Sequence, residues 1–287
     1  MSRNDFKYWR AFKRLRMVGG SLAMPQLCFG TVQSNLAITL HKALELGYRH
    51  IDGADGYQSG NPDYFNIIAD AIKAVRREDL WITWKSDLIS IENINKTLKR
   101  LDCQYFDLYL VHHGCGDDIH FNVLKQAQAM GLIRYYGVSN CENFETIQRL
   151  KADHNIFANQ IQARPPGGQI KGRRPLVPVN FIEACNAIDV HVMIFSTIGS
   201  IYNALYNGAE FDIEYFSNNA NNINKYYMQK YLIPFNNAII VSSASGDSII
   251  ANFRLFRETI ETHDNLLDPE KMHEIEQFLT SFQLDRM

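Results

Sequence analysis

The sequence predicts an α/β fold, a single (β/α)8 TIM-type barrel over residues 1–287 with an N-terminal extension at 1–17 and an N-terminal hairpin. Eight short runs rich in β-branched and aromatic residues each precede a segment with helical periodicity, which is typical of βα units around a parallel sheet. The chain has 287 residues and is 46% hydrophobic, enough for one large core. It contains no Gly-x-Gly-x-x-Gly turn, which a doubly wound open sheet would require after its first strand.

The expected elements alternate along the chain. Strands are predicted at 26–32, 48–51, 80–85, 106–112, 133–138, 156–161, 190–195 and 238–241. Helices are predicted near 37–46, 63–75, 91–101, 121–130, 141–151, 179–188, 223–232 and 247–261, with a last helix opening at Asp268–Pro269. A hairpin around Gly19–Gly20 would close the barrel floor. The Asn-rich stretch at 218–224 is expected to be a flexible solvent loop, and the less favoured alternative is a mobile flap over the barrel mouth.

Residues that start or stop helices lie at the expected boundaries. Gly47 and Gly131 follow two helices as C-terminal caps, where a left-handed backbone favours glycine. Ser90 and Asn140 can accept the first free N–H groups of the next turns. Pro269 would occupy the first helical position of the last helix, where its missing N–H costs little.

Composition excludes several classes of partner. A net charge of -2 and a pI near 6.5 give no reason to expect nucleic acid or an anionic membrane, so we expect a small-molecule substrate and a monomer or weak oligomer. No apolar run is long enough to span a bilayer. Five cysteines lack a paired spacing and follow no apolar leader, which predicts unpaired thiols and a cytoplasmic protein.

Polar residues end successive predicted strands. In a barrel, catalytic groups gather at the carboxyl ends of the strands, because the βα loops there form one concave face. Asp52 ends the second strand with Tyr57 five residues later, Lys85 ends the third and His112 the fourth. Further polar or aromatic strand ends are Ser139, Asn140, Gln160, Phe195 and Ser196.

The first four of these residues can form a proton donor. A tyrosine phenol titrates near 10 unaided, and an adjacent ammonium such as Lys85 lowers that pKa. Asp52 would keep Lys85 charged in a desolvated site, and His112 would orient a substrate oxygen. Any one of the four could have a purely structural role, but four at three successive strand ends favour general acid chemistry by Tyr57.

The residues around these positions resemble the aldo-keto reductases from about Met24 to Phe256. The matching stretches are Gly47-Tyr48-Arg49-His50-Ile51-Asp52 with Ala54 and Tyr57, Ile82-Thr83 with Lys85, Asp107-Leu108-Tyr109-Leu110-Val111-His112, Gly131-Leu132-Ile133-Arg134, Gly137-Val138-Ser139-Asn140 and Asn159-Gln160.

The resemblance implies an NADPH-dependent reduction of an aldehyde or ketone, with Asp52, Tyr57, Lys85 and His112 as the catalytic tetrad. It implies that Ser139, Asn140 and Gln160 hold the nicotinamide carboxamide and that Phe195, followed by Ser196, stacks on the ring. Gly199 and Ser200 would meet the pyrophosphate. Residues expected at the adenosine end are Ser242, Ser243, Ser248 and Asn252.

Several positions depart from the family pattern. Ser242 and Ser248 stand where the family places a lysine and an arginine against the extra phosphate of NADPH, so we expect NADPH binding with tolerance of NADH. Val32, His113 and Arg164 replace residues of the substrate pocket. The segment after His112 is short, which predicts an open site for bulky carbonyls.

Two other functions fit parts of the sequence. A non-catalytic regulator could bind the nicotinamide cofactor on the same barrel, because fold does not imply function. A metal-dependent barrel hydrolase is the less favoured alternative; its candidate ligands crowd one loop as His112, His113, Cys115, Asp117, Asp118 and His120. Neighbours on a strand point to opposite faces, so His112 and His113 should not share a metal, and we expect no metal site.

Overall fold

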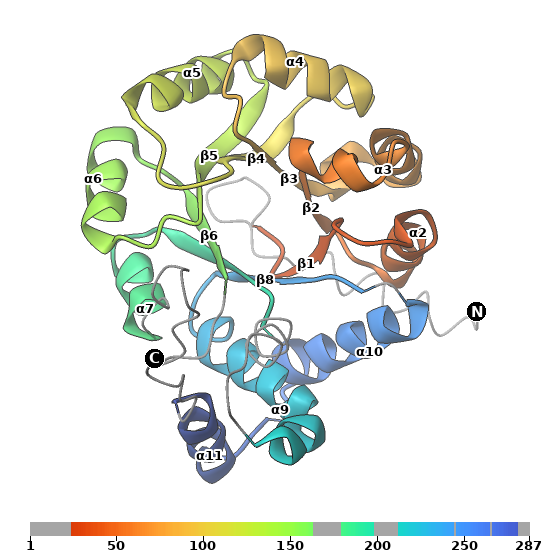
Figure 1. Ribbon diagram of the computed structural model, residues 1–287, viewed down its shortest axis with the longest axis vertical. Coiled ribbons are helices and arrows are strands. Elements are labelled where there is room, and N and C mark those ends of the chain that lie inside the picture. Colours follow the sequence, from red (N-terminus) through yellow and green to blue (C-terminus); the bar gives the residue numbers. More distant parts are fainter. Residues whose placement is uncertain (1–23, 163–178, 198–211, 244, 265, 281–287) are drawn as a thin grey trace, which may run out of the picture.

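The computed structural model describes residues 24–162, 179–197, 212–243, 245–264 and 266–280. Eight parallel strands close into a barrel in the order β1 to β8, and β8 pairs with β1 through Leu27 and Ile239. Figure 1 looks into this barrel, with the helices arranged around it. The predicted (β/α)8 barrel is therefore confirmed. The expected extension and hairpin at Gly19–Gly20 lie outside the described residues.

All eight predicted strands form, with bounds shifted by a few residues at most. The strands are β1 (Leu27–Gly30), β2 (His50–Ala54), β3 (Trp81–Ser86), β4 (Phe106–Val111), β5 (Ile133–Ser139), β6 (Ala158–Gln162), β7 (His191–Phe195) and β8 (Ala238–Val241). The helices are α2 (Leu36–Leu46), α3 (Tyr64–Ile72), α4 (Ile91–Arg100), α5 (Asp118–Ala129), α6 (Phe144–His154), α7 (Val179–Ala187), α9 (Ile213–Tyr231), α10 (Gly246–Phe256) and α11 (Pro269–Thr280). Shorter helical turns are η2 (Asp55–Gly60), η3 (Arg77–Asp79) and the π-helical η4 (Arg257–Glu261).

Apolar residues pack in two clusters because side chains alternate across each strand. Leu108 and Leu110 of β4 belong to a small cluster with Cys28, Ala158 and Met193, contributed by three other strands. Tyr109 and Val111, their neighbours on β4, belong to the large cluster between strands and helices. Layers of inward side chains fill such barrels, so the strands are buried on both faces and the polar groups collect at the mouth.

Local chemistry sets most helix boundaries as expected. Gly47 caps α2 in a left-handed conformation with φ 111°, and Gly131 also has a positive φ of 74°. The Ser90 side chain accepts the N–H of Asn93 at the start of α4. The prediction for Asn140 is wrong, because α6 begins three residues later than expected and Asn143 accepts the N–H of Thr146 in its place.

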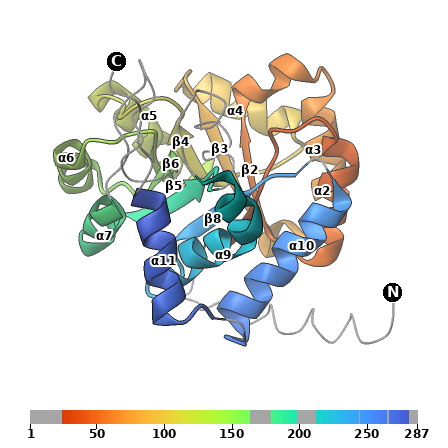
Figure 2. The ribbon, with the colours of Figure 1, turned by 60° about the horizontal axis from the view of Figure 1, so that its bottom comes forward.

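The Asn-rich stretch at 218–224 is helical, which corrects the expected solvent loop. It lies within α9, which begins ten residues before the predicted helix start at 223. Asp212 begins α9 by accepting the N–H of Tyr215, and Phe216 and Ile223 are buried. Figure 2 shows α9 between α10 and α11 beside the barrel. None of the helices in the described ranges is both long and apolar enough to cross a bilayer.

Candidate active site

A buried ion pair joins β2 and β3 at the mouth of the barrel. Lys85 Nζ lies 2.5 Å from Asp52 Oδ2, and both side chains are almost fully buried. Gln160, in the middle of β6 (Ala158–Gln162), donates to the other carboxylate oxygen, Asp52 Oδ1, at 2.7 Å. Ion pairs hidden from water require such additional hydrogen bonds, since desolvation is costly. Gln160 therefore supports the charged pair from across the barrel, a contact that sequence reasoning missed.

Tyr57 lies next to this ion pair because hydrogen bonds hold its helical turn, η2, against β3 and α4. The Asp55 carboxylate, at the start of η2, accepts hydrogen bonds from Trp84 Nε1 and Asn93 Nδ2, both at 2.8 Å. Gly53 lets the same segment approach β3, because a Cβ there would lie 2.4 Å from the Trp84 ring. The Tyr57 ring centroid then lies 5.1 Å from Lys85 Nζ. Asp55 is a positioning residue that no motif had indicated.

Burial and charge act in opposite directions on Tyr57 and Lys85. Burial raises the pKa of Tyr57 above its usual value, and the lowering by the Lys85 charge and hydrogen bond does not overcome it. The expectation of a lowered tyrosine pKa is therefore wrong in its net direction. Burial alone would lower the pKa of Lys85, but Asp52 and Tyr57 raise it above its usual value. This direction agrees with the expectation that Asp52 favours the charged form of the lysine.

His112 follows β4 and faces Tyr57. The two ring centroids are 5.7 Å apart and the ring planes are nearly perpendicular. Burial, and then the charge of Lys85, lower the pKa of His112 to about 4. Its backbone is held between strands: His112 N–H donates to Ser86 O at 3.0 Å, and His112 O accepts from Asn140 Nδ2 at 3.1 Å. At neutral pH the imidazole is uncharged and can form a hydrogen bond with a substrate oxygen.

One cavity of about 820 Å³ brings most of the predicted site residues together. Its size falls within the range of small-molecule pockets. Asp52, Tyr57 and His112 line it, with Lys85 behind Asp52. The predicted cofactor residues that line it are Ser139, Asn140, Gln160, Phe195, Ser196, Ser242, Ser243, Ser248 and Asn252. Val32 and His113 line it as well, whereas Gly199, Ser200 and Arg164 lie outside the described residues.

The far end of the cavity is polar but uncharged. Ser245 caps α10 by accepting the N–H of Ser248, and the two serine hydroxyls lie 3.0 Å apart. No lysine or arginine occurs among the described residues that line the cavity. Asn221 and Asn224 of α9 also line it. The sequence favoured a solvent loop for that stretch over a flap across the cofactor, so neither residue had been assigned to the site.

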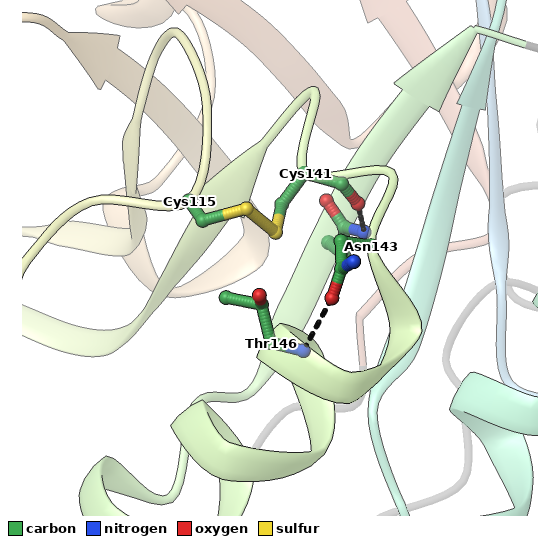
Figure 3. The surroundings of a disulfide bond; sticks show 5 residues. Cys115, Cys141, Asn143 and Thr146 are labelled. Atoms are coloured by element: carbon green, nitrogen blue, oxygen red, sulfur yellow. Dashed lines mark hydrogen bonds between the residues drawn. A yellow bond between two sulfur atoms is a disulfide. The ribbon is translucent and has the colours of Figure 1, made fainter. Parts of the chain in front are cut away.

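A disulfide bond links two loops at the mouth and corrects the expectation of unpaired cysteines. Cys115, after β4, bonds to Cys141, after β5, with the Cα atoms 4.7 Å apart (Figure 3). Asn159 Nδ2 donates to Cys141 O at 2.7 Å. Gly114 and Ser139 form an isolated antiparallel bridge in the same place. The disulfide therefore connects the His112 loop to the Ser139–Asn140 segment, although 26 residues separate the cysteines.

Most candidate ligands of the metal-hydrolase alternative have other partners. Cys115 is in the disulfide, and Asp117 and His120 form a capping box at the start of α5. Asp118 pairs with His154 of α6 at 2.9 Å. The argument that His112 and His113 point to opposite faces is wrong, however. The strand ends at Val111, and the two rings stack with centroids 4.1 Å apart.

Fold and site together define a β/α barrel with a buried Lys85–Asp52 pair beside Tyr57 and His112 at the mouth. A sequence model of the aldo/keto reductase family matches residues 26–285. The 7-acetyl-epi-neemfruitin B aldo-keto reductase of Melia azedarach is 27% identical over 293 residues, covering 89% of this chain and 86% of that protein. The chain belongs to the aldo/keto reductase family, whose members are NADP-dependent oxidoreductases.

Other relatives match shorter stretches or share the fold. The (1S)-1,7-diacetoxy-luvungin A aldo-keto reductase of Citrus sinensis is 31% identical over 215 residues, and the match spans 62% of this chain and 63% of that protein. The crystal structure of the Bombyx mori aldo-keto reductase AKR2E4 with NADP superimposes with a TM-score of 0.70 at 25% identity, covering 89% of each chain. Aldose reductase from Giardia lamblia shares the fold, with a TM-score of 0.69 at 21% identity over 92% of this chain and 94% of that one.

Proposed function

We propose that this chain reduces an aldehyde or ketone to an alcohol with a reduced nicotinamide cofactor, and that Tyr57 donates the proton. The observation that carries the proposal is the buried Lys85–Asp52 pair beside Tyr57, next to a neutral His112 and inside the same cavity as the amide and serine side chains. A charged lysine, a protonated phenol and a neutral imidazole form a coherent acid site.

Each residue of the site has a distinct task in this reaction. The nicotinamide supplies the hydride when it is bound. Tyr57 gives its proton to the carbonyl oxygen, and the Lys85 ammonium stabilises the phenolate that remains. Asp52 keeps Lys85 protonated and in place, with Gln160 holding the carboxylate. His112 binds the carbonyl oxygen and sets its approach to Tyr57.

The chemistry of the cavity walls fits a dinucleotide. The side chains of Ser139 and Asn140 offer hydroxyl and amide groups to a carboxamide near Tyr57, and Phe195 offers an aromatic face to a planar ring. At the other end, Ser242, Ser243, Ser248 and the N-terminus of α10 offer neutral donors to a phosphate. Gly199 and Ser200 would complete the pyrophosphate contact, and Asn252 would meet the adenine.

We infer binding of NADPH with tolerance of NADH. Charge-assisted contacts to phosphate are about twice as strong as neutral ones, and the described lining residues include no cation. Asp247, in the first turn of α10, adds a negative charge close to this end. Both features weaken the preference for NADPH over NADH that the extra phosphate of NADPH could provide.

The substrate is a small-molecule carbonyl compound, and we infer that bulky ones are accepted. Val32 is a small side chain at the cavity wall and is 57% exposed. Only six residues separate Val111, the end of β4, from Asp118, the start of α5, so the segment after His112 cannot form a long lid. His113, and Arg164 outside the described residues, are the other candidates for substrate contacts.

A panel of carbonyl compounds tests the proposal directly. Oxidation of NADPH and of NADH is followed by absorbance at pH 7 with small, aromatic and bulky aldehydes and ketones. We expect cofactor-dependent turnover with both cofactors and with extended substrates. Tight cofactor binding without turnover of any carbonyl would contradict the proposal and favour a non-catalytic cofactor-binding regulator. Turnover restricted to small aldehydes would contradict only the inference that bulky carbonyl compounds are accepted, and not the proposed reduction itself.

A further inference from the structure

Three potential metal ligands converge at the rim of the cavity. His113 Nδ1 lies 2.9 Å from Asp87 Oδ1, and His112 Nδ1 lies 3.9 Å from Asp87 Oδ2. The ligand atoms of all three residues lie within 4.8 Å of one another. Among the described residues, this is the one group of three or more His, Cys, Asp and Glu side chains with such a spacing.

The spacing suits a tetrahedral ion. Zinc binds imidazole nitrogen at about 2.0–2.1 Å and carboxylate oxygen at about 2.0–2.2 Å, which separates neighbouring ligand atoms by about 3.3 Å. The His113–Asp87 separation of 2.9 Å and the His112–Asp87 separation of 3.9 Å lie on either side of this value, and the two histidine nitrogens are within 4.8 Å of each other. Side-chain rotations can therefore bring the three atoms to coordination distance. Two imidazoles and one carboxylate favour Zn²⁺ and related transition ions over Mg²⁺ and Ca²⁺, which prefer oxygen ligands only.

The backbone holds the two histidines on one side. Because β4 ends at Val111, His112 and His113 lie in a bend in which the strand alternation no longer applies. Hydrogen bonds from His112 N–H to Ser86 O and from Asn140 Nδ2 to His112 O fix this bend. Asp87 directly follows β3, the strand paired with β4, so both loops carry their ligands to the same point.

The cluster is accessible from solvent and also reaches the reaction site. The side chains of His113 and Asp87 are 68% and 62% exposed, whereas that of His112 is 12% exposed. An ion can therefore enter from water and keep a water molecule in its fourth position, as open three-ligand zinc sites do. The least exposed residue of the cluster is His112, whose imidazole was proposed above to bind the carbonyl oxygen of the substrate.

We propose that Asp87, His112 and His113 form a binding site for a divalent transition-metal ion, with Zn²⁺ as the expected ion, and that its occupation inhibits the enzyme. A bound ion holds His112 at the rim and adds two positive charges there, so the imidazole no longer orients a carbonyl oxygen. The inhibitory part rests on the proposed carbonyl reduction, whereas the binding part does not.

Binding is tested on the intact protein by isothermal titration with Zn²⁺ after removal of bound metal, and by the visible absorption of Co²⁺, which reports coordination geometry. We expect one saturable site with a tetrahedral Co²⁺ spectrum. Asp87→Asn and His113→Gln should each weaken Zn²⁺ affinity by at least about tenfold, equivalent to about 1.4 kcal/mol. Circular dichroism verifies that each variant is folded.

Asp117→Asn is the matched control, because Asp117 is another exposed aspartate whose carboxylate lies 2.9 Å from a histidine Nδ1, that of His120. Asparagine caps a helix as well as aspartate does, so α5 should remain intact. Zn²⁺ affinity should not change in this variant. Absence of a saturable site, or unchanged affinity in both Asp87→Asn and His113→Gln, would overturn the proposal.

Inhibition is tested with the best carbonyl substrate found. Saturating Zn²⁺ should reduce kcat/KM of the wild type at least about tenfold, EDTA should restore it, and Asp87→Asn should resist the same concentration. Turnover that is unaffected by a measured Zn²⁺ occupancy overturns the inhibitory role. A complete lack of turnover before any metal is added would instead contradict the proposed reductase function.

Discussion

The two ends of the cavity hold their polar groups in different ways. At the acid end, Asp52 and Lys85 are buried and paired, and Gln160 and Tyr57 complete their contacts. At the phosphate end, Ser242, Ser245 and Ser248 are exposed, and serine hydroxyls there contact one another. Buried charges demand partners, and a single substitution leaves an uncompensated group. Exposed hydroxyls can still contact water when a neighbour is replaced, so we expect substitutions at the serine end to cost less than substitutions at the acid end.

Substitution of Tyr57 should produce the largest change. Tyr57→Phe removes the proposed proton donor, so kcat/KM for carbonyl reduction should fall by roughly 10²- to 10⁴-fold. Steady-state kinetics measure this loss, and fluorescence titration should find cofactor affinity nearly unchanged. Tyr105→Phe is the matched control, since the Tyr105 hydroxyl is buried without a hydrogen-bond partner and Arg77 stacks on its ring. Activity of Tyr57→Phe within threefold of wild type, an allowance of about 0.7 kcal/mol, would rule out the donor role.

Loss of the disulfide should destabilise the protein. A cross-link between residues 26 apart stabilises a fold by about 3 kcal/mol through the entropy of the unfolded chain. Cys115→Ser combined with Cys141→Ser should lower the free energy of unfolding by about this amount in urea titrations.

The effect of this double substitution should extend to the acid end, since the bond joins the loops that carry His112 and Asn140. Affinity for NADH should fall with it. Cys103→Ser serves as the control, because Cys103 is a free, half-buried thiol away from the mouth. If the double variant matched this control in both stability and affinity, the disulfide would have no part in shaping the site.

A positive charge introduced at the serine end of the cavity should increase the preference for NADPH over NADH. Ser248→Arg places a guanidinium at the start of α10, where it can contact an additional phosphate, so the affinity ratio of NADPH to NADH should rise roughly tenfold. Fluorescence titration with both cofactors measures the ratio. Ser248→Gln, which is long but neutral, is the control and should leave it unchanged.

The wild-type preference for NADPH should stay below about a thousandfold, equivalent to about 4 kcal/mol. A larger preference would mean that another group of the protein already binds the additional phosphate of NADPH. The same titrations decide this, and in that case Ser248→Arg should change the ratio little.

The smallest expected effect is a loss of folding stability at low pH. The pKa of His112 is about 4 in the folded protein, below the value near 6.5 of an unfolded chain. The unfolded state therefore binds the proton more readily, and the stability contribution present above pH 6.5 is lost as the pH falls toward 4. Relative to His112→Gln, the wild type should lose on the order of 1 kcal/mol over this range, since partial solvent access screens the effect.

Urea titrations from pH 7 to 4 measure this difference. The imidazole should remain uncharged from pH 8 down to about 5, so kcat/KM should show no histidine-type transition in that range. A transition near pH 6.5 that disappears in His112→Gln would contradict the neutral state.

The barrel and the candidate residues of the acid end could be predicted from the amino-acid sequence alone. Apolar runs, helical periodicity and caps such as Ser90 and Gly47 depend on neighbouring residues, so they could be recognised without the structure. Asp52, Lys85 and His112 lie at or just after the ends of three successive strands as predicted from the sequence, and the carboxyl ends of parallel barrel strands meet at one rim. The family resemblance added the cofactor residues, most of which line the same cavity.

The contacts between side chains across the rim depended on the folded structure. Strand register brings Gln160 to Asp52, 108 residues away, and loop geometry joins Cys115 to Cys141 and Asp87 to the histidine pair. The direction of the Tyr57 pKa also depended on the fold, because burial and the Lys85 charge oppose each other and only the packing sets their balance. Spacing along the chain contains neither register nor burial, and for that reason the sequence could name the residues of the acid site but not their net electrostatics.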